Sequence, residues 1–142
     1  MSLSTARPDP LTVEVEDLIG TVVARYYEEY ERAAARHALT GPQARILALL
    51  TPAPLPMRQI ARALKCEPSN VTGMIDRLVA RGLVERRLDQ DDRRVKLAAA
   101  TERGAAISRH LRESLDFARV PLAGLTDAER LTLRDLLRRM LA

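Results

Sequence analysis

Residues 67–82 carry a helix pattern that strongly limits what this chain can fold into. Apolar residues recur there at steps of three and four, as on a helix with one buried side: Val71, Met74, Ile75, Leu78 and Val79. Pro68 opens the segment and Gly82 closes it, the positions that these residues favour at helix ends. The other face carries small polar groups and then charge: Ser69, Asn70, Thr72, Gly73, Asp76 and Arg77. Such a face can approach phosphates and base edges closely, which indicates a helix that reads DNA.

The residues around this helix predict a compact arrangement of short elements. Thr40 with Gln43 forms a capping-box pattern that starts a helix running to Leu50. Residues 51–56 contain three prolines and are predicted to be a loop, residues 57–64 a short helix, and residues 65–67 a turn. Residues 83–88 and 95–99 are predicted strands on either side of a turn at 89–92. Helices followed by a β-hairpin constitute a winged helix-turn-helix, so we expect a mainly α (α+β) fold of this type.

Longer helical patterns stand at both ends of the chain. Residues 1–10 are predicted to be a flexible leader, and residues 11–38 a long helix. Thr101 is expected to cap a helix that reaches about Val120, where Pro121 and Gly124 interrupt the pattern. A second capping box, Thr126 with Glu129, starts the last helix.

Composition narrows the class of protein. The net charge of +4 and the pI of about 9.8 suit a polyanionic partner, although so small a charge is also ordinary. The single cysteine excludes an internal disulfide framework and fits a reducing cytoplasm. No signal-like stretch occurs, and no apolar run approaches the ~20 residues that cross a bilayer. We therefore expect a cytoplasmic protein without a membrane partner.

Together these segments resemble the MarR family of bacterial transcriptional regulators, from about Leu11 to the C-terminus. The resemblance rests on the order and spacing of LTGPQ (39–43), PSNVT (68–72), DRL (76–78), RGLVER (81–86) and DDRR (91–94) before Thr101. It implies a homodimer in which residues 11–39 and 102–142 form the dimerisation region. Residues 40–101 would be the winged domain that binds a pseudo-palindromic operator in double-stranded DNA. It also implies a repressor that a small aromatic or phenolic effector releases, although activation remains open.

The predicted DNA contacts fall into two groups on and after the reading helix. Ser69, Asn70, Thr72, Gly73 and Arg77 are expected in the major groove, where Asn can pair with adenine and hydroxyls can meet bases or phosphates. The same polar residues are also common in any first helical turn. Arg81, Arg86 and Arg87 are expected at phosphates, which fix register without reading sequence.

The predicted wing combines arginines with three aspartates, which favour turns by bonding their own backbone. In the family, the Asp-x-Arg spacing marks the arginine that enters the minor groove. The resemblance therefore assigns Arg94 to the minor groove and Asp92 to its positioning, with Arg93 as the alternative arginine. A narrow A·T-rich groove would favour this insertion.

Other chemistry has little support in the sequence. Tyr26, Tyr27 and Tyr30, with His37, are candidates for an effector pocket, although aromatic residues on a helix more often pack. Cys66 is interpreted as a small turn residue, because oxidant-sensing members carry their cysteine in the first helix, where this chain has none. His37 and His110 have no metal-ligand spacing, and no phosphate-binding Gly loop or nucleophile elbow occurs. We expect no enzyme activity, cofactor or metal; the alternative is a winged-helix protein-interaction module without sequence-specific DNA binding.

Overall fold

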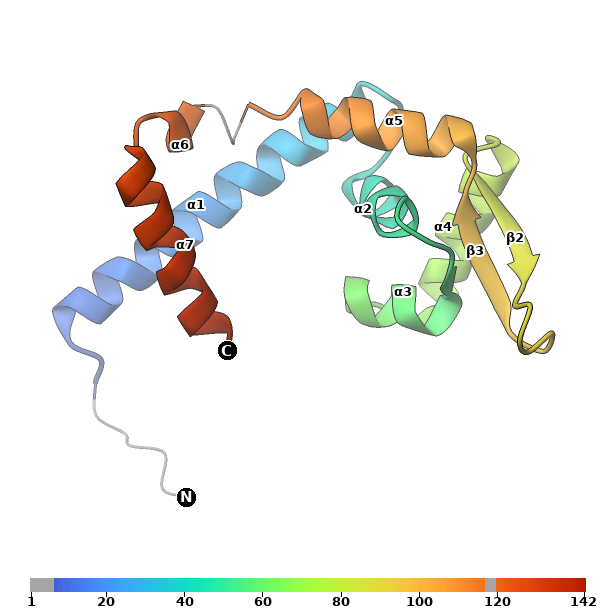
Figure 1. Cartoon of the computed structure of the whole chain (residues 1–142), viewed down its shortest axis with the longest axis horizontal. Coiled ribbons are helices and arrows are strands. Elements are labelled where there is room, and N and C mark those ends of the chain that lie inside the picture. The colour runs from blue at the N-terminus through green and yellow to red at the C-terminus, as the bar shows by residue number, and fades with distance from the viewer. Residues whose placement is uncertain (1–6, 117–119) are drawn as a thin grey trace, which may run out of the picture. The chain divides into compact units, whose positions relative to one another are not determined.

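The computed structural model describes residues 7–116 and 120–142 and has the mainly helical fold that the sequence predicts (Figure 1). Its elements are α1 (Pro10–Ala35), α2 (Gly41–Leu50), β1 (Leu55–Pro56), α3 (Met57–Leu64), α4 (Pro68–Ala80), β2 (Val84–Leu88), β3 (Lys96–Ala100), α5 (Glu102–Glu113), α6 (Val120–Ala123) and α7 (Asp127–Leu141). The chain divides into two compact units. We call Tyr30–Leu115 the winged unit, and Met1–Glu29 with Asp116–Ala142 the terminal unit.

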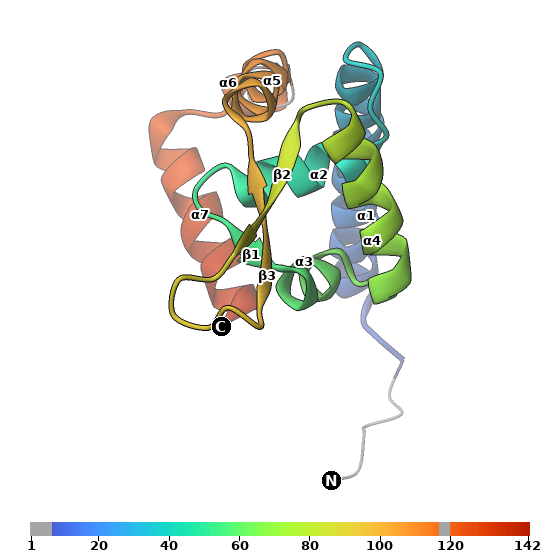
Figure 2. The same ribbon diagram turned by 90° about the vertical axis from the view of Figure 1, so that its right-hand side faces the viewer.

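The winged unit contains a three-stranded antiparallel sheet in the order β1-β3-β2 (Figure 2). β2 and β3 form the predicted hairpin, in register from Val84 opposite Ala100 to Leu88 opposite Lys96. The predicted loop at 51–56 is wrong at its end, because β1 pairs with β3 through Leu55 opposite Ala98. This strand is short and lies at the edge of the sheet, where a proline such as Pro56 is tolerated.

The core of the winged unit is aliphatic. On α4, the side chains of Val71, Ile75 and Leu78 are fully buried, while Met74 and Val79 pack partly buried against the same cluster. Other members of this cluster come from α2, α3, the turn before β2 and the sheet: Ile46, Leu47, Leu50, Ile60, Leu83, Val84 and Ala98. The apolar stripe read from the sequence is therefore the buried face of α4, and its polar face is left for solvent or a partner.

The starts of the helices follow their capping residues. Both predicted capping boxes are present, Thr40 with Gln43 on α2 and Thr126 with Glu129 on α7. The hydroxyl of Thr101 accepts a bond from the backbone N–H of Gly104. At the start of α1, outside the predicted helix, Asp9 accepts bonds from the backbone and hydroxyl of Thr12. These acceptors satisfy N–H groups that a helix cannot pair internally.

Two helix ends differ from the prediction, and one short helix was not predicted. α1 ends at Ala35 instead of Ala38, because the chain turns through Ala38 with a left-handed φ of 54°. α5 ends at Glu113 instead of about Val120, and the Ser114 hydroxyl bonds back to the Leu111 carbonyl, as serine does near helix ends. Pro121 lies inside α6, an additional short helix, and residues 117–119 lie outside the described residues.

The winged unit is larger than the predicted winged domain, residues 40–101. Ala33 and Ala34 at the end of α1 are buried in its core, and so is Leu111 of α5. Gly104 approaches the sheet so closely that a Cβ built there would lie 2.0 Å from the Leu83 carbonyl oxygen. Burial of these residues joins the end of α1 and all of α5 to the winged unit, whereas the family resemblance places both in the dimerisation region.

The terminal unit leaves many large apolar side chains exposed. On α1 these include Leu11, Val15, Leu18 and Val22, which recur at three- and four-residue steps, and on α7 they include Leu136, Leu137 and Met140. Of the predicted leader, residues 1–6 lie outside the described residues and Pro10 already belongs to α1. No helix in the described parts of the chain is long and apolar enough to span a bilayer.

Candidate nucleic-acid interface

The exposed face of α4 has the polar groups that the sequence predicted. Ser69, Asn70, Thr72 and Arg77 are exposed, and a Cβ built on Gly73 would meet nothing within 4 Å. Figure 2 shows α4 at the surface of the winged unit. Short side chains and an open glycine allow another molecule to approach the backbone of this helix closely.

Local bonding limits what the first turn of α4 can offer. The Thr72 hydroxyl donates to the Pro68 carbonyl over 3.0 Å, so its oxygen is left as an acceptor. Glu67 occupies the N-cap position without a side-chain cap bond, so the backbone N–H groups of this turn have no carboxylate partner there. An exposed helix N-terminus of this kind suits phosphate oxygens.

The four arginines on and after α4 have different surroundings. The Arg81 guanidinium donates to the backbone carbonyls of Ala38 and His37, at 2.7 and 2.8 Å, and therefore holds the chain after α1. Arg86 forms an ion pair with Asp76, and the Arg87 Nε donates to Glu85 over 2.8 Å. The exposed Arg77 has no ion pair among the described residues. The phosphate role of Arg81, Arg86 and Arg87 stays a prediction.

Asp76 belongs to the candidate interface although the sequence did not predict a role for it there. It lies on the polar face of α4 and bonds to Arg86 of β2, so it links the reading helix to the wing.

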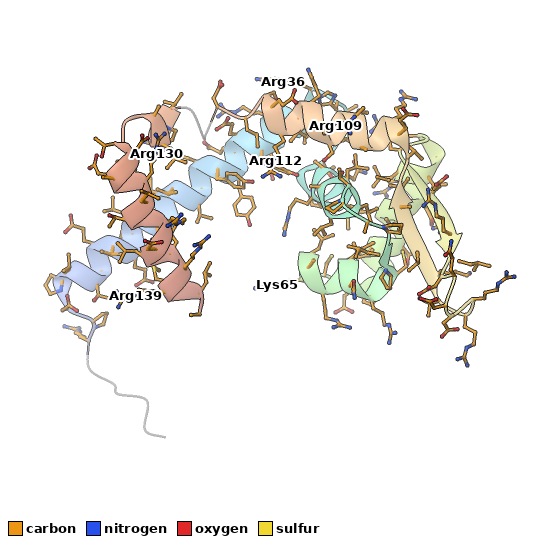
Figure 3. The ribbon with its side chains drawn as sticks, in the orientation of Figure 1. Arg36, Lys65, Arg109, Arg112, Arg130 and Arg139 are labelled. Atoms are coloured by element: carbon orange, nitrogen blue, oxygen red, sulfur yellow. The ribbon has the colours of Figure 1, made fainter. Side chains whose placement is uncertain are left out.

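Arg62 and Lys65 were also not predicted as interface residues. They line one shallow groove with Cys66 and Asn70, beside the start of α4 (Figure 3 labels Lys65). In a helix-turn-helix, the first helix crosses the DNA backbone. Cations on or just after that helix, such as Arg62 and Lys65, are therefore candidates for phosphate contacts.

The turn of the wing is organised by its aspartates. Asp89 accepts the backbone N–H of Asp91 over 3.0 Å, as expected for an aspartate that shapes a turn. Asp92 accepts both the backbone N–H and the Nε of Arg94, each over 3.1 Å. The bond from the Arg94 side chain, and after it the bond from the Arg94 backbone, hold the pKa of the Asp92 carboxyl below its usual value of 3.8. Asp92 therefore remains ionised at neutral and mildly acidic pH.

The Asp92 contact leaves Arg94 projecting from the wing. The Arg94 side chain is 92% exposed even though Asp92 holds its Nε. Arg93 is exposed as well, and no hydrogen bond or ion pair with another described residue anchors its side chain. Asp92 thus contacts Arg94 in the way that a positioning residue would. Insertion of Arg94 into a minor groove stays a prediction.

Each residue proposed for the effector pocket makes a core or ring contact. Tyr30 is buried in the core of the winged unit, and Tyr26 lies edge-on to Tyr27 with ring centroids 6.0 Å apart. His37 contacts His110. The assignment of Tyr26, Tyr30 and His37 to an effector pocket stays a prediction.

Cys66 packs partly buried against the core, as expected for a small turn residue. Within residues 7–116 and 120–142, no group of three or more His, Cys, Asp or Glu side chains could hold a metal ion.

Comparison with known proteins agrees with the winged helix-turn-helix class of this fold. Residues 38–95 match the model of the MarR family. Wild-type MarR from E. coli in its apo form is 27% identical, with a TM-score of 0.76 over 96% of this chain and 100% of that chain. The comparison with curated protein sequences gives no match.

Two further solved structures carry ligands. A mutant of E. coli MarR complexed with operator DNA is 26% identical, with a TM-score of 0.73 over 95% of this chain and 100% of that one. CouR from Rhodococcus jostii RHA1 bound to p-coumaroyl-CoA is 28% identical, with a TM-score of 0.72 over 96% and 95% of the two chains. The chain has the fold of DNA-binding regulators and is similar to the MarR family, by the match of its winged region and by structural likeness along nearly its whole length.

Proposed function

We propose that this chain is a cytoplasmic, homodimeric transcriptional regulator that represses genes from a pseudo-palindromic operator and is released by a small-molecule effector. The observation that carries the proposal is the pairing of two surfaces in the winged unit. The exposed polar face of α4 has Asn70 at its start, and the wing projects Arg94 from a carboxylate anchor. A related E. coli protein with the same fold is complexed with operator DNA.

On DNA, the two surfaces have different tasks. The first turn of α4 enters the major groove, where Ser69 and Asn70 reach base edges and Arg77 follows along the groove. Arg94 enters the adjacent minor groove, and the remaining cations meet phosphates. In a symmetric dimer, the two α4 helices occupy successive major grooves, about 34–36 Å apart centre to centre.

The apolar side chains of the terminal unit support dimer formation. Leu11, Leu18 and Val22 on α1 are each more than half exposed, and so is Met140 on α7. Large contiguous apolar surfaces on a protein mark interaction sites. A second copy of the chain is the partner that the family resemblance implies, and a symmetric dimer matches a pseudo-palindromic operator.

The dimer is tested by placing a charge on the apolar stripe of α1. Leu18→Glu should convert the dimer to monomer and reduce operator affinity at least about tenfold, because a buried carboxylate without a partner opposes association. Sedimentation velocity and DNA titration measure the two effects. Ala24→Glu is the matched control, because Ala24 lies on the opposite side of α1 from Leu18 and Val22. A dimeric Leu18→Glu protein with unchanged DNA affinity would refute the assignment of this face.

An effector is proposed on the likeness to a ligand-bound relative. CouR is bound to p-coumaroyl-CoA, a phenolic thioester. This ligand is of the aromatic or phenolic class that the family resemblance implies for an effector. Such a ligand releases DNA only if it binds the released arrangement more tightly than the DNA-bound one. The proposed role is regulation without catalysis.

The competing function is a winged-helix module that binds another protein. The two functions differ in their response to salt, because cations that neutralise phosphates release counterions when DNA binds. A steep fall of affinity with ionic strength favours the regulator, and a flat profile favours the protein-interaction module.

A further inference from the structure

Two histidines from distant parts of the sequence meet at the surface of the winged unit. His37 lies in the turn after α1 and His110 lies on α5. Their ring nitrogens, Nε2 of His37 and Nδ1 of His110, are 3.3 Å apart, and the ring planes are nearly perpendicular at 88°. These are the only two histidines of the chain. The contact joins the end of α1 to α5.

The proton content of the two rings decides whether this contact is attractive. A neutral imidazole has one donor and one acceptor nitrogen, so two rings with at most one extra proton can share a hydrogen bond. When both rings carry an extra proton, two N–H donors and two positive charges face each other. Imidazoles ordinarily gain this proton between about pH 5 and 8.

The charged side chains next to the two histidines in the sequence are mostly positive. Arg36 precedes His37, and Arg109 and Arg112 flank His110 on α5; Figure 3 labels these three side chains. From α4, Arg81 bonds the His37 carbonyl, and from α2, Arg45 donates to the Ala63 carbonyl. The carboxylate within one turn of His110 on the same helix is Glu113, which is already engaged.

The histidine contact is coupled to the reading helix through Arg81. Arg81 is the C-cap residue of α4, and its guanidinium holds the carbonyls of His37 and Ala38, with Ala38 in a left-handed conformation. The His37 backbone is therefore tied to α4 while its ring is tied to α5. α5 in turn follows strand β3 of the wing.

We propose that His37 and His110 form a proton-sensitive joint, which opens when both rings are protonated and so lowers DNA affinity in mildly acidic solution. Opening removes the side-chain contact that joins the turn after α1 to α5, whereas the Arg81 bonds and the core burial of Ala33 and Ala34 remain. The joint lies between the turn that Arg81 ties to α4 and the helix that follows the wing, so its opening is expected to disturb both DNA-reading surfaces, and the inference rests on the proposed function. Asp92 stays ionised in this range and cannot produce the effect.

The sign of the pH response separates this joint from ordinary electrostatics. Added positive charge on a DNA-binding protein generally strengthens binding, since DNA is a polyanion. The joint predicts the reverse: from about pH 7.5 to about pH 5.5, operator affinity of the wild-type protein should fall about five- to tenfold, at the lower end of coupling between linked sites. The affinity is measured by titration of an operator duplex at constant ionic strength.

Substitution of either histidine tests the joint. His110→Gln and, from the other side, His37→Gln should abolish the loss of affinity in acid, because glutamine can bond but takes up no proton in this range. His110→Lys carries a permanent charge but can still donate to a neutral His37 ring, so it should bind normally at about pH 7.5 and keep the loss of affinity in acid. Arg109→Gln is the matched control, which places the same side chain one position earlier on α5 and should keep the wild-type pH response.

A measurement without DNA keeps the joint testable independently of the proposed function. The thermal midpoint of wild-type protein should fall by a few °C more between the two pH values than that of either glutamine variant. Absence of DNA binding at every pH would refute the proposed function, and the thermal comparison would still decide on the joint. A wild-type affinity that is constant or rises in acid, or a pH response that persists in both glutamine variants, would overturn the joint.

Discussion

Replacing Gly104 with alanine is expected to destabilise the winged unit severely. A Cβ at this position would lie 2.0 Å from the Leu83 carbonyl oxygen and 3.0 Å from its carbonyl carbon. The obstacle is backbone, and that backbone is fixed because the Leu83 oxygen also accepts the N–H of Thr101 over 3.1 Å. Relief of the clash requires α5 to move away from the junction between α4 and the sheet. We expect a loss of about 3 kcal/mol or more, at the upper end for overpacked cores.

Thermal unfolding of Gly104→Ala measures this loss as a fall of Tm by about 10 °C or more. Gly73→Ala is the matched control, since it also lies in a helix of the winged unit but a Cβ there meets nothing within 4 Å. Alanine is the better helix former, so Gly73→Ala should raise stability by about 0.5–1 kcal/mol. Equal Tm values for the two variants would show that α5 does not pack on Leu83 as described.

Replacing Arg94 with alanine is expected to weaken operator binding more than the loss of any other single arginine. The Arg94 side chain projects from the wing while Asp92 fixes its Nε, so little conformational freedom is lost when it enters a groove. Without it, affinity should drop at least about tenfold. The slope of log affinity against log salt should become shallower by about 0.9 for each phosphate that is no longer neutralised, or about twice that in a symmetric dimer.

The control for Arg94→Ala is Arg134→Ala, which removes an equal charge from the exposed surface of α7, outside the winged unit. Arg93→Ala is measured beside them, because Arg93 is the alternative wing arginine. If Arg93→Ala reproduces the loss and Arg94→Ala does not, the minor-groove role belongs to Arg93. An unchanged affinity and slope in both variants would remove the wing from the interface.

The parts of the fold that the sequence predicted are those with local causes. The stripe of Val71, Ile75 and Leu78 appears within one helix, and burial on one side follows from its period. The caps at Thr40 and Thr126 act over three residues, so their signals are complete in the sequence. The Asp92–Arg94 contact spans two residues and belongs to the same class.

The features that the sequence did not reveal depend on contacts between distant residues. Strand β1 exists only because Leu55 meets Ala98, and no local propensity marks a two-residue edge strand beside prolines. The Arg81 side chain bonds carbonyls 43 and 44 residues away, so its structural role has no local signal in the sequence. His37 and His110 are 73 residues apart, and only the packing of α5 brings them together.

Titration of wild-type protein with an operator duplex selected from the source genome, repeated over a range of ionic strengths, tests the central claim most directly. We expect two chains per duplex and a log–log salt slope of about −0.9 for each phosphate neutralised. A protein that stays monomeric and retains no duplex even at low salt would contradict the claim.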